Sequence, residues 1–177
     1  TYAITPTTHL TGGVRWTSDR RKLPRGFTDR VNSAGVVVAH FTNVIDSVTY
    51  DEVTFRGALR QDLTDKVNVY VSVNKGFKSG EFNLQTPQDA PVRPETIMAY
   101  EAGLKGDLLD NRLRLNAAVF HYDIDDYQVR SSIGGISALQ NAAKVKIDGV
   151  DINAEAAVTS QFHLTAGMSY LDARYSR

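Results

Sequence analysis

The chain has 177 residues, enough for one domain with a hydrophobic core. Its 20 Lys and Arg residues balance 20 Asp and Glu residues, so no overall charge indicates a nucleic-acid partner or a cationic one. The sequence has no cysteine, which excludes a disulfide framework, a thiolate metal site and a cysteine nucleophile.

Hydropathy does not predict a membrane-spanning helix. The most apolar short run, Gly35 to Phe41, is interrupted by His40 and is far shorter than the ~18 residues that such a helix needs. A transmembrane barrel strand needs no such run, because only alternate residues face lipid. The chain starts at Thr1 without a basic and then apolar leader, so we expect it to be part of a longer polypeptide.

The first half of the chain is dominated by a period-two alternation, which places one residue set on each face of a β-strand. The first such run is Leu10–Thr17, in which Leu, Gly, Val and Trp occupy the even positions. The next runs are Val53–Arg60 and Val67–Asn74, and the second has valine at all four odd positions. Because Leu63–Lys66 joins them closely, these two runs predict an antiparallel hairpin.

The second half continues this pattern with Met98–Lys105, Arg112–Val119 and Leu164–Tyr170. Between the last two, the apolar residues are odd-numbered before Gly149 and even-numbered after it, which predicts a β-bulge at the glycine. We therefore predict an all-β fold, an antiparallel up-and-down meander of about seven long amphipathic strands.

The connections alternate between short and long, as they do in outer-membrane barrels with short periplasmic turns and long outer loops. The short ones are Leu63–Lys66, Leu108–Asn111 and Val158–Gln161, and the long polar ones are Ser18–Ser47, Ser79–Pro94 and Asp123–Ala142. Aromatic residues recur near strand ends, as in interfacial girdles: Trp16, Phe77, Tyr100 and Tyr170. From periodicity alone, a soluble β-sandwich binding module and another outer-membrane barrel, such as a porin or a translocator, stay open.

Several segments carry a family resemblance. Arg93-Pro94-Glu95-Thr96 followed by Tyr100-Glu101-Ala102-Gly103-Leu104-Lys105 resembles the "PE…YE-x-G-x-K" signature of TonB-dependent receptor barrels, and Asn111–Phe120 resembles the strand after it. Val69–Gly80 is similar to that family's "vYas-x-x-kGfksG" strand. Asn141–Asp151 resembles "NA…k-x-x-G-v-E", with Asp151 where Glu is usual. The resemblance spans about residues 9 to 176.

The resemblance implies a 22-stranded outer-membrane barrel closed by an N-terminal plug. Such receptors take up ferric siderophores, cobalamin, haem or saccharides with energy from the inner-membrane TonB complex, and they are not enzymes. We expect residues 1–177 to form an open wall segment from the C-terminal half of such a barrel, a segment of a larger transmembrane β-barrel. The expected partners are outer-membrane lipid and lipopolysaccharide, the TonB complex through N-terminal parts outside this sequence, and a nutrient such as a ferric siderophore; we expect no nucleic acid and no cofactor.

Candidate ligand-binding residues are cationic and aromatic. A basic cluster in the first long connection could bind lipopolysaccharide phosphates or an anionic ferric chelate; it comprises Arg20, Arg21, Lys22, Arg25 and Arg30. A second set would stand at loop bases around a vestibule and suits catecholate or carboxylate ligands: Lys78, Arg93, Tyr127, Gln128 and Arg130. A solvated loop remains the alternative for both sets.

Other clusters favour structural roles over chemistry. Asp123, Asp125 and Asp126 resemble part of a calcium loop but lack its glycine and its bidentate glutamate, so we expect a solvated strand end. Glu101 and Lys105 would lie ~13 Å apart along one strand, which favours cross-strand pairing over proton transfer. Gly134-Gly135 lacks the rest of a phosphate loop and predicts a turn. The four histidines lie too far apart for a zinc motif: His9, His40, His121 and His163.

Overall fold

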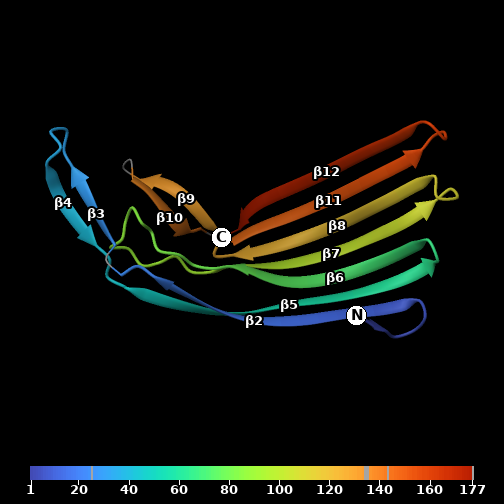
Figure 1. Ribbon diagram of the computed structural model, residues 1–177, viewed down its shortest axis with the longest axis horizontal. Helices are drawn as coiled ribbons and strands as arrows, with labels where there is room; N and C mark the ends of the chain where they lie inside the picture. Colours follow the sequence, from blue (N-terminus) through green and yellow to red (C-terminus); the bar gives the residue numbers. More distant parts are fainter. Residues whose placement is uncertain (25, 134–135, 143, 177) are drawn as a thin grey trace.

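The computed structural model describes residues 1–24, 26–133, 136–142 and 144–176, and its core element is one antiparallel sheet (Figure 1). The eight strands of this sheet follow the order β1 (Tyr2–Ala3), β2 (Thr8–Lys22), β5 (Ser47–Thr64), β6 (Val67–Lys78), β7 (Glu95–Leu108), β8 (Leu113–Asp125), β11 (Lys144–Ala157) and β12 (His163–Ser176). Among the described residues, no helix is long and apolar enough to cross a membrane. The predicted meander of seven long strands is confirmed, and the two-residue strand β1 is added at one edge.

Short and long connections lie at opposite ends of the sheet, as predicted (Figure 1). Long connections are not purely irregular, however, because two of them contain separate hairpins: β3 (Phe27–Val31) with β4 (Val37–Thr42), and β9 (Gln128–Ile133) with β10 (Ile136–Asn141). In the first hairpin, the Asn32 side chain accepts hydrogen bonds from the backbone N–H groups of Ala34 and Val36, which closes the turn. The predicted turn at Gly134-Gly135 lies outside the described residues.

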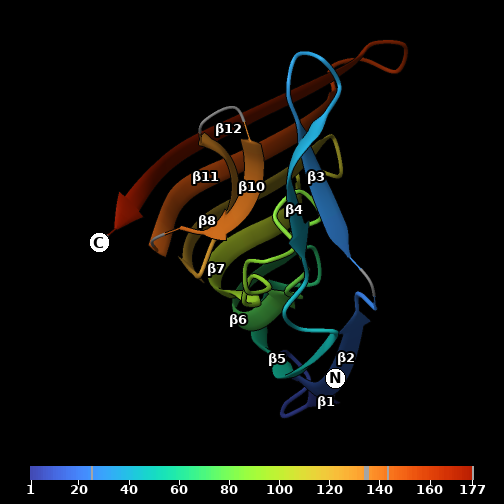
Figure 2. The same cartoon turned by 90° about the vertical axis from the view of Figure 1, so that its left-hand side faces the viewer.

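The cross-strand register separates two faces of the sheet. One row of directly opposed residues crosses seven strands and is apolar throughout: Leu10, Leu59, Val71, Ala102, Val119, Val150 and Tyr170. Five of these side chains are more than two-fifths exposed. The neighbouring row, on the opposite face, is His9, Arg60, Tyr70, Gly103, Ala118, Asp151 and Ser169. We call the first the outer face and the second the concave face; Figure 2 shows the sheet as an arc with the 79–94 segment and β9–β10 over its hollow.

The exposed apolar side chains of the outer face form a band that crosses the strands obliquely. On β2 the band runs from Leu10 to Trp16, and on β12 it runs from Leu164 to Tyr170. Since Leu10 and Tyr170 belong to one row of opposed residues, the band shifts by about one residue (~3.3 Å) for each strand spacing of ~4.8 Å. That shift corresponds to a strand tilt of about 35°, within the range of transmembrane barrels.

Aromatic side chains mark the edge of this apolar band that faces the long loops. Trp16 on β2, Tyr100 on β7 and Tyr170 on β12 all lie on the outer face and are exposed. When the strand tilt of about 35° is taken into account, the three residues lie at about the same height along the axis of the tilted strands' barrel, at the loop-side edge of the apolar band. Phe77 lies closer to the loops than this level, opposite Thr96. Three of the four predicted girdle residues therefore form the expected aromatic belt.

A small buried core lies at the long-loop end, on the concave face. It comprises Val92, Ile124, Ala138, Leu139 and Val145, contributed by the 79–94 segment, β8, β10 and β11. The predicted bulge at Gly149 is wrong, because β11 pairs without interruption with both β8 and β12. The alternation changes phase because the loop-side part of β11 lies outside the apolar band. In that part, the outer face carries the charged residues Lys146 and Asp148, and the concave face carries the buried Val145. Gly149 itself leaves room for the Phe120 ring, which lies where its Cβ would be.

Candidate functional site

The middle of the concave face carries a polar cluster centred on Tyr70. Its hydroxyl donates a 2.6 Å hydrogen bond to Oε1 of Glu101, and Nζ of Lys105 lies 5.3 Å from the centre of its ring. Glu101 and Lys105 on β7 thus each contact Tyr70 on the neighbouring strand β6, which agrees with the expected cross-strand pairing. Tyr70 alternates with the apolar valines of β6, and it is the residue of this cluster that the sequence did not single out.

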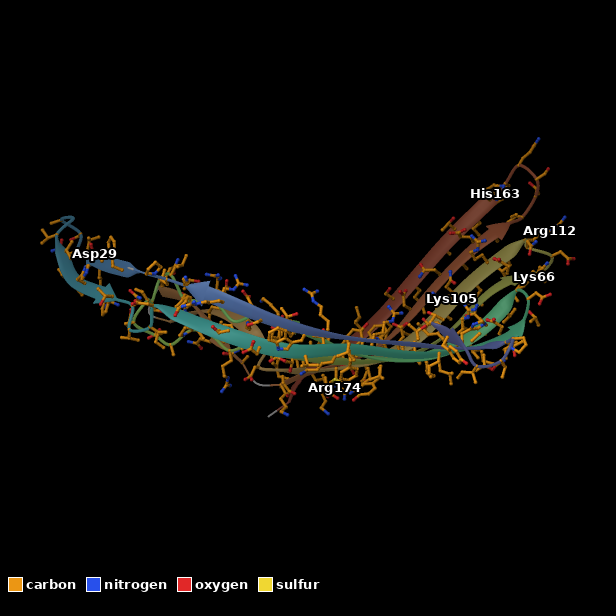
Figure 3. The ribbon with its side chains drawn as sticks, turned by 60° about the horizontal axis from the view of Figure 1, so that its bottom comes forward. Asp29, Lys66, Lys105, Arg112, His163 and Arg174 are labelled. Carbon is orange, nitrogen blue, oxygen red and sulfur yellow. The ribbon has the colours of Figure 1, made fainter. Side chains whose placement is uncertain are left out.

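Two hollows adjoin this cluster along the concave face. One, of about 200 Å³, lies between β7, β8 and β11 and is lined by Glu101, Asn116, Asp151 and Asn153. The other, of about 300 Å³, lies toward β5 and is lined by Arg56 and Arg60. The wall thus presents carboxylates and amides on one side of Tyr70 and guanidinium groups on the other. Figure 3 shows Lys105 on this side of the sheet, toward the end that carries the short turns at Lys66 and Arg112.

The hydrogen bond between Tyr70 and Glu101 gives the first testable expectation. We expect Tyr70→Phe to lower the free energy of unfolding of the full-length protein by about 2 kcal/mol, because a hydrogen bond to a charged group is lost. Tyr170→Phe is the matched control, since Tyr170 is 61% exposed on the outer face. Denaturant unfolding monitored by gel mobility measures both variants; an equal effect of the two would contradict the assignment.

A second polar cluster ties the bases of two long connections together. Asn141 accepts a 2.8 Å hydrogen bond from the backbone N–H of Arg93, and its amide donates to the carbonyls of Arg93 (3.0 Å) and Asp126 (2.8 Å). The Arg93 guanidinium forms an ion pair with the Asp126 carboxylate. We call Asn141, Arg93 and Asp126 the loop-base clamp. It joins the start of β7 to the base of the β9–β10 hairpin.

Gln128 extends the loop-base clamp toward β6. Its side-chain amide donates to the carbonyls of Ser79 (3.1 Å) and Arg93 (2.9 Å), and its backbone N–H donates to Glu95 (2.8 Å). The side chain is only 6% exposed. Gln128 was predicted to face a vestibule, and this prediction needs correction, because the residue is buried and its amide is used within the chain.

The 79–94 segment is held on the concave face by further contacts. Tyr50 donates a 2.9 Å hydrogen bond to the carbonyl of Val92, and burial raises the pKa of Tyr50, so this hydroxyl stays protonated at neutral pH. Asn83 is buried and donates to the carbonyl of Leu139 on β10 (2.9 Å). Gly80 is buried against the first of these contacts: a Cβ at this position would overlap the Val92 carbonyl and the Tyr50 ring.

This close approach predicts a strong effect of a single methyl group. We expect Gly80→Ala to destabilise the attachment of the 79–94 segment by about 2 kcal/mol, because a backbone carbonyl has to move. Gly57→Ala is the control, since a Cβ there would meet only Val73 at an ordinary 3.5 Å. Hydrogen exchange of residues 79–94 should increase in the first variant alone; unchanged exchange would contradict the packing described.

The structure separates the predicted basic cluster. Arg20, Arg21 and Lys22 lie on the end of β2 and not in a loop, so they alternate between faces, and Arg21 pairs with Asp19 at 2.8 Å. Arg30 lies on β3 over the Phe41 ring, and Arg25 is outside the described residues. Because β2 extends farther than predicted, these residues do not form one patch.

The predicted vestibule residues lie closer together than the residues of the basic cluster do. Lys78 pairs with Glu95 in the sheet register, Tyr127 adjoins Gln128, and Arg93 belongs to the loop-base clamp. Arg130 lies farther out on β9, opposite Leu139. The sequence missed Asn141 as the residue that organises this region, although it begins the "NA" motif. The aspartates after Tyr122 are ion-paired: Asp123 with Lys146, Asp125 with Lys144, and Asp126 with Arg93.

Comparisons with known proteins agree on one family. A family model described as TonB dependent receptor-like, beta-barrel, matches residues 1–177. The chain is 27% identical over 184 residues to the probable TonB-dependent siderophore receptor PiuA of Acinetobacter baumannii, over 98% of this chain and 23% of that protein. The ferric yersiniabactin uptake receptor FyuA of Yersinia pestis has a TM-score of 0.77 at 21% identity, over 99% of this chain and 26% of that one.

A further solved structure shows the same fold. The ferric-catecholate import receptor Fiu of E. coli K12 has a TM-score of 0.71 at 19% identity, over 99% of this chain and 27% of that one. The chain thus spans about a quarter of the length of each of these relatives.

Proposed function

Because this chain belongs to the TonB-dependent receptor-like β-barrel family, whose members are bacterial outer-membrane proteins, we propose that it forms one wall of an uptake receptor for a scarce nutrient. A ferric siderophore is the ligand class that we favour, because the related PiuA, FyuA and Fiu are named for siderophore or ferric-chelate uptake. The proposed role is transport, and it assigns no catalytic step to these residues.

The observation that carries this proposal is the opposite character of the two faces. An oblique apolar band on the outer face suits a lipid bilayer, whereas the carboxylates, amides and guanidinium groups of the concave face suit a hydrated lumen. In a closed barrel, the open edges of β2 and β12 would pair with strands outside residues 1–177. We therefore propose that residues 1–177 are a partial barrel domain.

The remaining partners follow from this placement. We propose that the concave face, around Tyr70 and Glu101, contacts a plug domain encoded outside this sequence, and that the plug communicates with the inner-membrane TonB complex. We propose that Lys78, Tyr127 and Arg130 face the ligand entry, because they lie at the long-loop end of the sheet, close to the loop-base clamp in sequence or register. Lipid and lipopolysaccharide would surround the outer face.

Uptake by cells that carry or lack the full-length gene tests this function. We expect deletion to abolish energy-dependent uptake of at least one ⁵⁵Fe-labelled siderophore, with recovery on complementation and no recovery without a TonB complex. Undiminished uptake of every ferric chelate tested would contradict the proposal. Uptake that is lost on deletion but needs no TonB complex would indicate a porin-like channel instead.

A further inference from the structure

The hollow of about 300 Å³ on the concave face is built around a small side chain. Ala58 on β5 lies directly opposite Thr11 on β2 and Ser72 on β6, and all three line the hollow. Their side chains share one face, because directly opposed residues of a sheet point the same way. Ser72 accepts a 3.2 Å hydrogen bond from the Asn74 amide, so its own hydroxyl hydrogen is available to a ligand.

Cations surround this hollow. Arg56 and Arg60 lie on β5, two residues to either side of Ala58, so both point to the same face as Ala58. Lys105 reaches the hollow from β7, with its Nζ 5.3 Å from the centre of the Tyr70 ring. Three positive side chains thus converge on a space that has room for a carboxylate group.

The carboxylates nearest to this hollow are already engaged. Glu101, which lines the hollow, accepts the 2.6 Å hydrogen bond of the Tyr70 hydroxyl. Asp62 lies 3.1 Å from Nε of Arg60 and 2.9 Å from Nε2 of His9. The positive charge of Arg60 is therefore compensated within the sheet.

Arg56 and Lys105 have no such compensation. Within the part of the chain that the structure describes, neither side chain forms an ion pair with a carboxylate. In the proposed function this face lines a lumen inside a bilayer, where charges are screened less than on an exposed surface. Two uncompensated cations beside a hydroxyl donor form a local field that attracts an anion.

The positive field belongs to one side of Tyr70. The neighbouring hollow of about 200 Å³, toward β8 and β11, is lined by the carboxylates of Glu101 and Asp151, with Lys105 as its cation. The hollow beside Ala58 has the opposite balance, with three cations and Glu101. The wall therefore separates acceptor groups from donor groups, and an anion fits only the side next to β5.

We propose that the hollow beside Ala58 is a carboxylate-binding site, with Arg56 and Lys105 as its charge partners and the Ser72 hydroxyl as a further donor. This inference rests on the proposed function, in which the concave face lines a lumen. A carboxylate has two sources there: an Asp or Glu side chain of a segment that fills the lumen, or a carboxylate of the transported chelate. Either one presents two oxygens to the guanidinium and the ammonium group.

Zero-length crosslinking of the full-length protein tests this site. A carbodiimide activates a carboxylate, and an amine that touches this carboxylate displaces the urea and forms an amide. We expect such an amide at Nζ of Lys105, located by mass spectrometry of the peptides. The ion pair between Lys144 and Asp125, at 2.9 Å, is the internal standard, because the same reagent should join these two side chains.

Two arms of the experiment identify the source of the carboxylate. An amide between Lys105 and an Asp or Glu outside residues 1–177, formed in the ligand-free protein, indicates a segment that fills the lumen. An amide between Lys105 and citrate, formed only after citrate or its ferric complex is added, indicates the transported ligand. If Lys105 forms no amide, or one with Glu101 alone, while Lys144 and Asp125 are joined, the site is overturned.

Substitution of Arg56 shows whether the carboxylate is held by the site. Arg56→Gln should lower the yield of the Lys105 amide about tenfold, because one charge-assisted contact is lost, whereas Arg56→Lys should retain most of it. Arg15→Gln is the matched control, since Arg15 is an exposed cation on the concave face of β2 and does not line the hollow. Equal yields in all three variants would contradict the site.

Uptake of ferric chelates by the same variants is scored separately from the crosslink. If deletion of the gene abolishes uptake but Lys105 forms no amide, the transport function stands and the carboxylate site fails. If the amide forms but deletion leaves uptake of every ferric chelate unchanged, the site stands and the transport function fails. The two proposals can therefore be rejected independently.

Discussion

Replacing Ile152 by arginine is expected to destabilise the folded full-length receptor by about 2–4 kcal/mol, the cost of a cation on the lipid face near the middle of a bilayer. Ile152 pairs with Ala117 on β8 and with Met168 on β12, in an outward row at the centre of the apolar band. Neither neighbour offers a carboxylate, so the guanidinium would have to reach a headgroup or draw water into the lipid. Reversible unfolding in phospholipid vesicles measures this change.

The same substitution above the band provides the control. Thr96 also lies on the outer face, between Phe77 and Asp125, at the level of the ion-paired residues. Thr96→Arg should change the unfolding free energy by less than about 1 kcal/mol, as exposed charges do. If both variants were equally stable, the outer face would not contact lipid at Ile152, and the band would be the interior of a soluble sheet instead.

The strands and turns were predictable because one face of each strand contacts a uniform medium. The four valines of Val67–Asn74 mark β6 without any knowledge of its neighbours. The same reasoning failed at Gly149, where a change of phase was interpreted as a bulge. A single sequence does not show that the concave side of Val145 is covered by other segments while the outer side leaves the membrane. A bulge and a change of environment give the same pattern.

The candidate site was less predictable, because its contacts join residues that are far apart in sequence. Asn141 and Arg93 are 48 positions apart, and the motifs that contain them gave no sign that they touch. Gln128 was predicted as a ligand residue for its polarity alone, and the same long-range contacts bury it. For Arg20 and Lys22, the error was one of strand length, because β2 continues to Lys22 and its residues alternate in direction.

Replacing Asn141 by alanine is expected to release the base of the β9–β10 hairpin at a cost of about 3 kcal/mol, about 1 kcal/mol for each of three lost hydrogen bonds. The backbone N–H of Arg93 and two carbonyls would lose their partner together. We expect faster hydrogen exchange at Arg93 and across β9–β10, with the strands of the apolar band unchanged, because the loop-base clamp lies at one end of the sheet.

Asn153→Ala is the matched control, since Asn153 lies on the concave face of β11 and donates one long hydrogen bond, 3.4 Å, to Asp151. Its effect should stay below about 1 kcal/mol. Unaltered exchange in Asn141→Ala would mean that the other contacts of the hairpin hold it without Asn141, namely the buried Leu139 and Ala138 and the hydrogen bonds of Asn83 and Gln128. If exchange rises and siderophore uptake falls while the barrel stays folded, Asn141 acts by positioning the loops around the ligand entry, although its own side chain is directed into the chain and contacts no ligand.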